Sequence, residues 1–174
     1  MPPFMSGGDM IESVHLRHAT YNQIPHKFEA GTPAVSSAVG LGAAVDYLSA
    51  LGMENVAAHE EALTAYALEV LPREVPGIRI HGSPDAAERA GIVTFTLPEA
   101  HAHDVATLLD REAVAIRAGH HCTQPLHERL GESATGRASF NVYSTTGDID
   151  RLAAGLRGVQ RVFGRRPATA GSSH

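Results

Sequence analysis

The chain has very few of the residues on which disulfide and lysine chemistry depend. Its 174 residues include a single cysteine, Cys122, and a single lysine, Lys27, while the other 13 cationic residues are arginines. One cysteine excludes an internal disulfide and any zinc site built from several cysteines. One lysine leaves a mechanism that needs a Schiff-base lysine with a single candidate in this sequence.

Basic blocks and long apolar runs are also missing. The formal net charge is −5 and no cluster of basic residues stands out, so a nucleic-acid-binding protein is not expected. No apolar run approaches the roughly 18 residues that a membrane span requires. The start, MPPFMSGGDMIES, has neither the cationic region nor the apolar core of a secretory signal. The hydrophobic fraction of 43% is that of a globular domain, and we expect a cytoplasmic location.

The hydrophobic pattern predicts an α+β chain without internal repeats. Apolar residues at helical spacing predict helices over residues 33–51, 55–71, 103–112 and 146–163. Short β-branched runs predict strands over residues 10–16, 77–81, 92–97, 113–117 and 138–143. Thr32 before Pro33 favours the start of the first helix, and Pro72 favours the end of the second. We therefore expect a small sheet covered by helices on one side, followed by a disordered tail at residues 164–174.

The densest polar cluster is the segment RAGHHC, residues 117–122, which follows a predicted strand. Its glycine and polar residues indicate an exposed loop. Arg117, His120 and His121 would favour the thiolate form of Cys122 in such a loop. A lone cysteine is otherwise often a small buried hydrophobic residue, so from the residues alone both interpretations of Cys122 stay open.

A resident zinc site is a competing interpretation of the histidines around this cluster. Imidazole and thiolate groups suit zinc, and His101, His103 and His127 lie near Cys122 in the sequence. However, no pair of these residues has helical i, i+4 spacing with a supporting acid, and no CxxC motif accompanies them. No resident metal is therefore expected.

Two further positions have a functional and a structural interpretation. Arg137 follows a glycine and precedes a predicted strand; it is either a surface arginine or a group that binds a carboxylate through two hydrogen bonds. Thr32, with Gly31, precedes a predicted helix, where backbone N–H groups favour an anion such as phosphate. A simple helix cap is the alternative for Thr32.

Three motifs in one register carry a family resemblance: FEAGTP at residues 28–33, RAGHHC at 117–122 and RASF at 137–140. With the opening MPPF and the Gly7-Gly8 pair, they resemble the Suf-type (group II) cysteine desulfurases and selenocysteine lyases of the class V aminotransferase superfamily. The similarity runs from residue 1 to about residue 163 and involves less than half of the family's chain. It implies the C-terminal small domain of a fold-type-I transferase at 33–163, with a small, mostly antiparallel sheet covered by helices, preceded by a remnant of the large domain and dimer-contact segment at 1–32.

The resemblance implies a role for each residue of the polar cluster. Cys122 matches the nucleophile that takes sulfur from L-cysteine, leaves L-alanine and holds the sulfur as a persulfide for iron–sulfur cluster assembly. Arg137 matches the residue that binds the substrate carboxylate, and Arg117 lies beside the same site. His120 and His121 flank the nucleophile, with no proton-transfer role assigned to either.

The residues that the family uses to bind pyridoxal 5'-phosphate are only partly present. Thr32, with Gly31, matches the residue that reaches the cofactor phosphate of the partner subunit in a homodimer. The family's Schiff-base lysine lies in an upstream Ser-x-His-Lys segment, whereas Lys27 directly precedes FEAGTP. The family's ring-stacking histidine and its aspartate at the pyridine nitrogen are also unmatched. We therefore expect the isolated chain to be inactive; a non-catalytic sulfur carrier or interaction module is the alternative.

The resemblance also bears on partners. His103 resembles the histidine that, in one branch of the family, takes a zinc ion from a sulfur-acceptor protein of the scaffold type; a surface histidine capping a helix is the alternative. Thr123 and His127 stand where the family more usually has apolar residues after the nucleophile.

Overall fold

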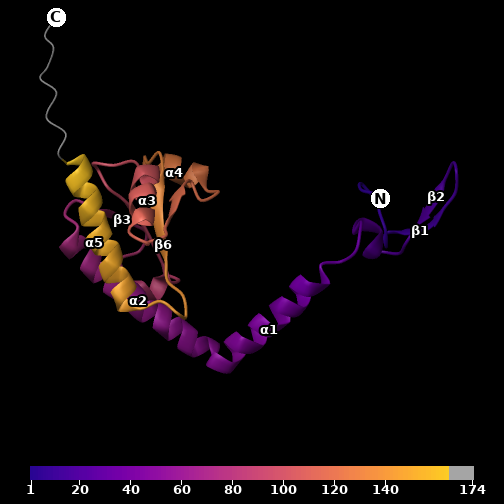
Figure 1. Ribbon diagram of the computed structural model, residues 1–174, viewed down its shortest axis with the longest axis horizontal. Helices are drawn as coiled ribbons and strands as arrows, with labels where there is room; N and C mark the ends of the chain where they lie inside the picture. The colour runs from indigo at the N-terminus through magenta and orange to yellow at the C-terminus, as the bar shows by residue number, and fades with distance from the viewer. Residues whose placement is uncertain (165–174) are drawn as a thin grey trace, which may run out of the picture. The chain divides into compact units, whose positions relative to one another are not determined.

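The computed structural model describes residues 1–164, and their contacts divide the chain into two compact units (Figure 1). The first unit is Met1–Ala50, and the second begins at Leu51. The sequence predicts a change of organisation earlier, after residue 32. The predicted disordered tail lies outside the described residues, apart from Gly164.

The first unit contains a hairpin, a short 3-10 helix and one long helix. In chain order these are β1 (Ile11–Val14), β2 (Ala19–Tyr21), η1 (His26–Phe28) and α1 (Val35–Leu51). The last residue of α1, Leu51, is counted with the second unit. The strand predicted near residues 10–16 is present as β1, whereas its antiparallel partner β2 was not predicted. Helix α1 starts later than predicted because the Val35 N–H donates to the Pro33 carbonyl in a tight turn, and none of its residues is buried.

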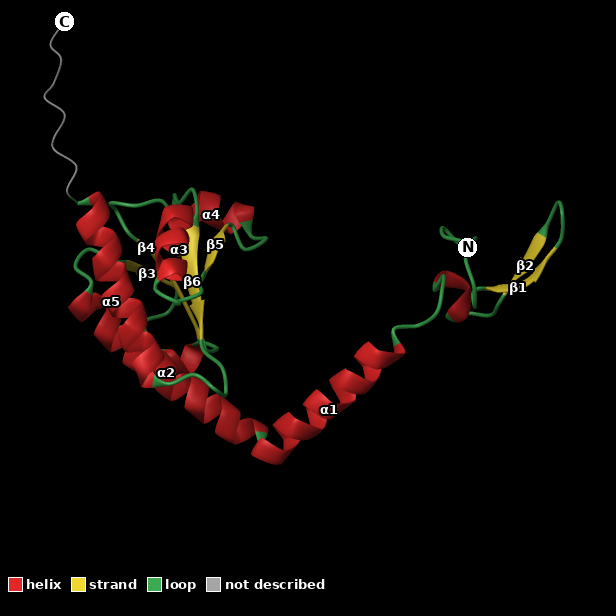
Figure 2. Cartoon of the chain, viewed as in Figure 1, coloured by secondary structure: helices red, strands yellow, loops and turns green. Residues whose placement is uncertain are grey.

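The second unit is an α+β domain with a four-stranded antiparallel sheet of order β3-β4-β6-β5 (Figure 2). Its elements are α2 (Met53–Glu74), β3 (Arg79–His81), η2 (Ala86–Glu88), β4 (Ile92–Thr96), α3 (Ala102–Arg111), β5 (Arg117–Gly119), α4 (Gln124–Leu130), β6 (Thr135–Ser139) and α5 (Thr146–Phe163). The prediction of a small antiparallel sheet packed with helices is confirmed.

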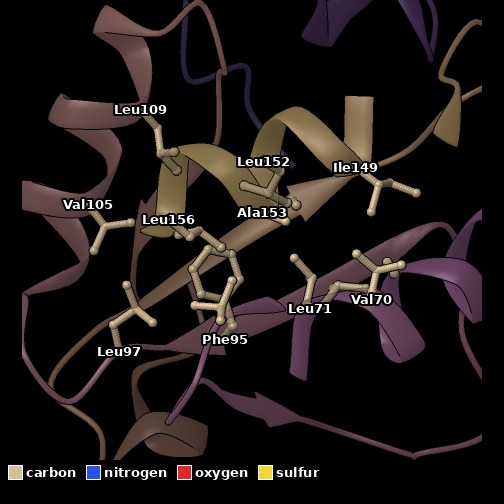
Figure 3. Packing of buried hydrophobic residues seen from close by; sticks show 14 of the residues in the cluster. Val70, Leu71, Phe95, Leu97, Val105, Leu109, Ile149, Leu152, Ala153 and Leu156 are labelled. Atoms are coloured by element: carbon tan, nitrogen blue, oxygen red, sulfur yellow. The ribbon is translucent and has the colours of Figure 1, made fainter. Parts of the chain in front are cut away.

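The core of this unit lies between one face of the sheet and helices α2, α3 and α5. Strand β4 alternates strictly: Val93 and Phe95 are fully buried, and the residues between them are half-buried or exposed. Figure 3 shows Phe95 packed near Leu71 of α2 and Leu156 of α5. The opposite face of the sheet is polar, as expected for an antiparallel sheet with one buried side, and it carries the candidate site.

Three local predictions are wrong, each for a physical reason. Helix α2 continues through Pro72 to Glu74, because a proline in the last turn removes a single hydrogen bond. The strand predicted at 113–117 begins only at Arg117, as β5, because Ala113 lies in a turn with φ +56° and residues 114–116 form no regular structure. The strand predicted at 138–143 instead ends at Ser139, because a turn starts at Asn141. Helix α4 was not predicted.

No single helix within residues 1–164 is long and apolar enough to cross a membrane. Helices α1 and α2 reach that length and composition only when the two are counted together.

Gly155 and Gly158 lie about one turn apart on α5 and provide a matched pair of substitutions. A Cβ on Gly155 would lie 2.5 Å from Cδ2 of Leu109, whereas a Cβ on Gly158 would meet only the far end of Arg161, at 3.8 Å. Because Leu109 is fully buried, Gly155→Ala is expected to lower the free energy of unfolding by about 1–3 kcal/mol through overpacking. Gly158→Ala should raise it by up to about 1 kcal/mol, since alanine is the better helix former.

Urea unfolding of the two variants checks this pair. Equal shifts of the two midpoints would contradict the close packing of α3 on α5.

Candidate active site

Cys122 lies in an exposed turn between β5 and α4. His121 and Cys122 both have left-handed backbones, with φ of +51° and +61°, a conformation that costs a residue with a Cβ roughly 1–2 kcal/mol. The turn is closed by Thr123, whose backbone N–H and hydroxyl both approach the His120 carbonyl, at 2.8 and 2.7 Å. Strained backbone persists only where its surroundings hold it. The fold therefore presents this thiol to solvent, and the interpretation of Cys122 as a buried hydrophobic residue is excluded for this chain.

A group of histidines lies beneath the turn. The Nε2 atom of His121 is 3.0 Å from the hydroxyl of Thr135 and 3.1 Å from its carbonyl oxygen. The Nε2 atom of His127 is 3.1 Å from the same hydroxyl. His127 and Thr135 are 3% and 0% exposed, so this contact ties α4 to the start of β6 inside the domain.

Burial also affects the charge of this group. Loss of hydration on burial is the main reason that the pKa of His121 lies below its usual value, with a smaller opposing effect from the Thr135 carbonyl. The neutral imidazole is therefore favoured at neutral pH. Its Nδ1 atom is buried and has no hydrogen-bond partner among the described residues. His120 is exposed, and its ring meets that of His127 edge to face, with 5.4 Å between the centroids.

Arg117 and Arg137 lie directly opposite one another on β5 and β6. Opposite residues of an antiparallel pair project from the same face of the sheet, and like charges in that arrangement repel each other. Arg137 is half-buried, and its Nε atom is buried without a hydrogen-bond partner among residues 1–164. Within the same residues neither arginine takes part in a salt bridge. Two arginines without salt-bridge partners among the described residues, on one face of the sheet, are suited to binding an anion.

A second group of polar side chains lies at the β3 end of the same sheet. This group was not predicted from the sequence. Nε2 of His81 is 3.2 Å from the Thr96 hydroxyl and 3.6 Å from a carboxylate oxygen of Glu132, which also binds Arg79 at 2.9 Å. Burial keeps the pKa of His81 below its usual value despite the nearby Glu132. These residues are far apart in the sequence, so only the pairing of β3 with β4 and of β4 with β6 could have shown their proximity.

His103 is exposed near the start of α3. Its backbone N–H donates to Nδ1 of His101 at 3.4 Å, and the two rings are 5.3 Å apart. A Cβ built on Gly119 would lie 3.9 Å from Cε1 of His103, which places this imidazole beside the end of β5, three residues before Cys122. Among the described residues no three His, Cys, Asp or Glu side chains are arranged to hold a metal ion.

The candidate cofactor residues lie in the first unit and are described separately. Thr32 is exposed and precedes α1 by three residues. Gly31 has φ +93°, a left-handed conformation that favours glycine, and its N–H donates to the Gly8 carbonyl at 2.9 Å. Lys27 lies in η1, with Nζ 5.5 Å from the centre of the Phe28 ring.

Comparison with known proteins gives one consistent picture. The family model described as aminotransferase class-V matches residues 1–152. A probable cysteine desulfurase of Streptomyces coelicolor is 52% identical over 164 residues, and a cysteine desulfurase of Haloferax volcanii is 47% identical over 163. Each alignment covers 94% of this chain but only 39% or 38% of the relative, so the chain spans about two fifths of the length of these relatives.

Solved structures agree with the sequence relatives. Cysteine desulfurase CsdA of Escherichia coli, in an S-sulfonic acid form, matches with a TM-score of 0.76 at 32% identity. The apo cysteine desulfurase of Thermococcus onnurineus matches with a TM-score of 0.75 at 33% identity. Both matches cover 94% of this chain, and 40% and 39% of the respective solved chains.

Proposed function

Because the chain belongs to the aminotransferase class-V family, we propose that it is the C-terminal part of a Suf-type, pyridoxal-phosphate-dependent cysteine desulfurase. The observation that carries the proposal is an exposed thiol, Cys122, that follows directly on a strand bearing one of two unpaired arginines. The complete enzyme would convert L-cysteine to L-alanine and hold the sulfur for iron–sulfur cluster assembly in the cytoplasm.

In this proposal Cys122 is the sulfur acceptor. Its thiolate attacks the sulfur of the bound substrate, so that an S–S bond forms while the C–S bond of the substrate breaks and the carbon fragment leaves as alanine after protonation. The exposed turn suits this step because the sulfur must next pass to another protein. The cationic side chain of Arg117 lies on the strand that leads into this turn.

Arg137 binds the substrate carboxylate, with Arg117 beside it. A guanidinium group offers two parallel N–H donors that match the two carboxylate oxygens. An incoming carboxylate would supply the partner that the Nε atom of Arg137 lacks and would offset the repulsion between the two arginines. The site is therefore suited to a small carboxylate substrate such as an amino acid.

The described residues do not by themselves form a complete pyridoxal-phosphate site. Lys27, the only lysine, lies in η1 against Phe28, and the motif that would surround a cofactor lysine is absent from the sequence. Thr32 and Gly31 are the residues of this chain that would contact a cofactor phosphate, across a homodimer interface. The remaining cofactor contacts would come from the other three fifths of the enzyme, where the cofactor supplies an electron sink for the substrate.

The proposed partner is a sulfur-acceptor protein of the zinc-containing scaffold type. His103 would coordinate the zinc of this partner, because its side chain is exposed and lies beside the strand that leads to Cys122. Imidazole is a good zinc ligand, and zinc has little geometric preference of its own. In this proposal the zinc belongs to the partner.

A second candidate function is a non-catalytic sulfur carrier or interaction module. The same exposed Cys122 favours it, together with the position of the single lysine, which directly precedes FEAGTP and lies outside any Ser-x-His-Lys segment. Such a module would accept persulfide sulfur from a complete desulfurase and would not release alanine from cysteine.

One experiment separates the two functions. Joining this chain to the N-terminal part of the Streptomyces coelicolor relative, in place of that protein's own matching segment, gives a joined enzyme of the relative's full length. We expect it to bind pyridoxal phosphate, seen by its visible absorbance, and to release alanine from L-cysteine. The isolated chain with cofactor should release none. Cofactor binding without alanine in the joined enzyme, combined with persulfide uptake by the isolated chain from a persulfidated donor, would favour the carrier.

A further inference from the structure

We propose that His127 and Thr135 are positioning residues for the nucleophile: together they hold His121 in one tautomer and fix the turn that presents Cys122. The structural part of this inference is independent of the reaction, and its consequence for sulfur transfer rests on the proposed function.

The polarity of the hydrogen bonds follows from one carbonyl group. Nδ1 of His127 lies 3.1 Å from the Thr123 carbonyl oxygen, which can only accept, so Nδ1 of His127 carries the hydrogen. Nε2 of a neutral His127 is then an acceptor, and the Thr135 hydroxyl donates to it. The same hydroxyl oxygen is left to accept from His121, whose Nε2–H points at both oxygens of Thr135.

These bonds form a directed chain from the turn into the domain and back. It runs from His121 through the Thr135 hydroxyl to His127, and from His127 to the carbonyl of Thr123. Thr123 is the residue that closes the turn and precedes α4. Both ends of the chain therefore lie within one residue of Cys122, while its middle is fixed between α4 and β6.

This series of hydrogen bonds accounts for the strained backbone of the turn. Two successive left-handed residues with side chains persist only if their neighbours fix them, and here the residues on either side of Cys122 are both bonded to the buried pair. An apolar residue at position 127 would bind neither Thr123 nor Thr135. It would also leave the Thr135 hydroxyl buried with one fewer partner, which is costly.

The tautomers are the direct test, because a purely space-filling histidine has no reason to adopt a particular one. In the 174-residue chain labelled with ¹⁵N-histidine, long-range ¹H–¹⁵N NMR should show His127 as the Nδ1–H form and His121 as the Nε2–H form. Thr135→Val removes the hydroxyl with little change of shape. It should turn His127 into a mixture of forms and accelerate exchange of the Thr123 amide roughly fivefold or more. Thr135→Ser keeps the hydroxyl and should retain both tautomers.

A second variant keeps the test decisive if Thr135→Val does not fold. His127→Leu fills the same space without hydrogen bonds, and it too should accelerate exchange of the Thr123 amide. Unchanged amide exchange in a folded His127→Leu variant would overturn the proposal, as would a Thr135→Ser variant that behaves like Thr135→Val.

The functional consequence is read in the joined enzyme. His127→Leu should slow alanine release about tenfold without changing the KM for cysteine or the cofactor absorbance. An unchanged rate, with the NMR results as expected, would limit the pair to a structural role. An inactive parent enzyme would instead contradict the proposed function and leave the tautomer result standing.

Discussion

Replacement of Cys122 by serine is expected to lower the rate of alanine release from L-cysteine in the joined enzyme by a factor of about 10³ or more. A serine hydroxyl is not ionised at neutral pH and is a far weaker nucleophile toward sulfur, so the step that forms the S–S bond is lost. The side chain is exposed and the substitution nearly isosteric. The turn, the buried histidines and the cofactor absorbance should therefore be unchanged.

A labelling measurement and a control variant test this prediction. Because Cys122 is the only cysteine of the chain, iodoacetamide should add one mass increment to the folded wild-type chain and none to the serine variant. Thr123→Ser serves as a neighbouring control, since it keeps the hydroxyl that binds the His120 carbonyl and should keep most of the activity. Alanine release by Cys122→Ser at the parental rate would remove Cys122 from the mechanism.

The part of the fold that follows local pattern could be predicted from the sequence. Helix α5 begins at Thr146 as expected, because Thr145 and Asp148 form a capping box and the apolar residues repeat at helical spacing. Strand β4 likewise follows its β-branched run. Helix α4 could not be predicted, because it is only seven residues long and buries a histidine in place of an apolar stripe.

The candidate site could likewise be predicted only in part from the sequence. The exposure of Cys122 follows from its polar neighbours, but its histidine support depends on Thr135, which is 13 positions away and reached only through the β5–β6 pairing. The opposition of Arg117 to Arg137 is also a property of strand register. Sequence therefore names the chemical groups near the nucleophile, and long-range pairing decides which of them meet.

The second large effect concerns Arg137. Removing its guanidinium with Arg137→Met should lower kcat/KM for L-cysteine about 10²-fold, mainly through KM, because a carboxylate loses two charged hydrogen bonds worth roughly 1.5–3 kcal/mol each, part of which Arg117 and water recover. Arg137→Lys should recover only part of the loss, since an ammonium group cannot bind both oxygens in the same geometry.

The effect of Arg137→Met on the free energy of unfolding shows whether Arg137 serves the fold or the substrate. In the unliganded chain Arg137 has no salt bridge among residues 1–164 and faces Arg117 across the strand pair. Arg137→Met should therefore leave stability unchanged or raise it slightly, since it removes a like-charge repulsion. A side chain that mainly stabilised the fold would show the reverse pattern, with lower stability and little change in KM.

A substrate without a carboxylate completes the argument. Cysteamine has the thiol and amine of cysteine but no carboxylate, so it cannot use Arg137 in either enzyme. The parent should prefer cysteine to cysteamine strongly, and Arg137→Met should reduce that preference by about the same 10²-fold factor by which it lowers kcat/KM for cysteine. If the variant loses activity equally toward both compounds, Arg137 does not bind the carboxylate and the anion site formed with Arg117 serves another group.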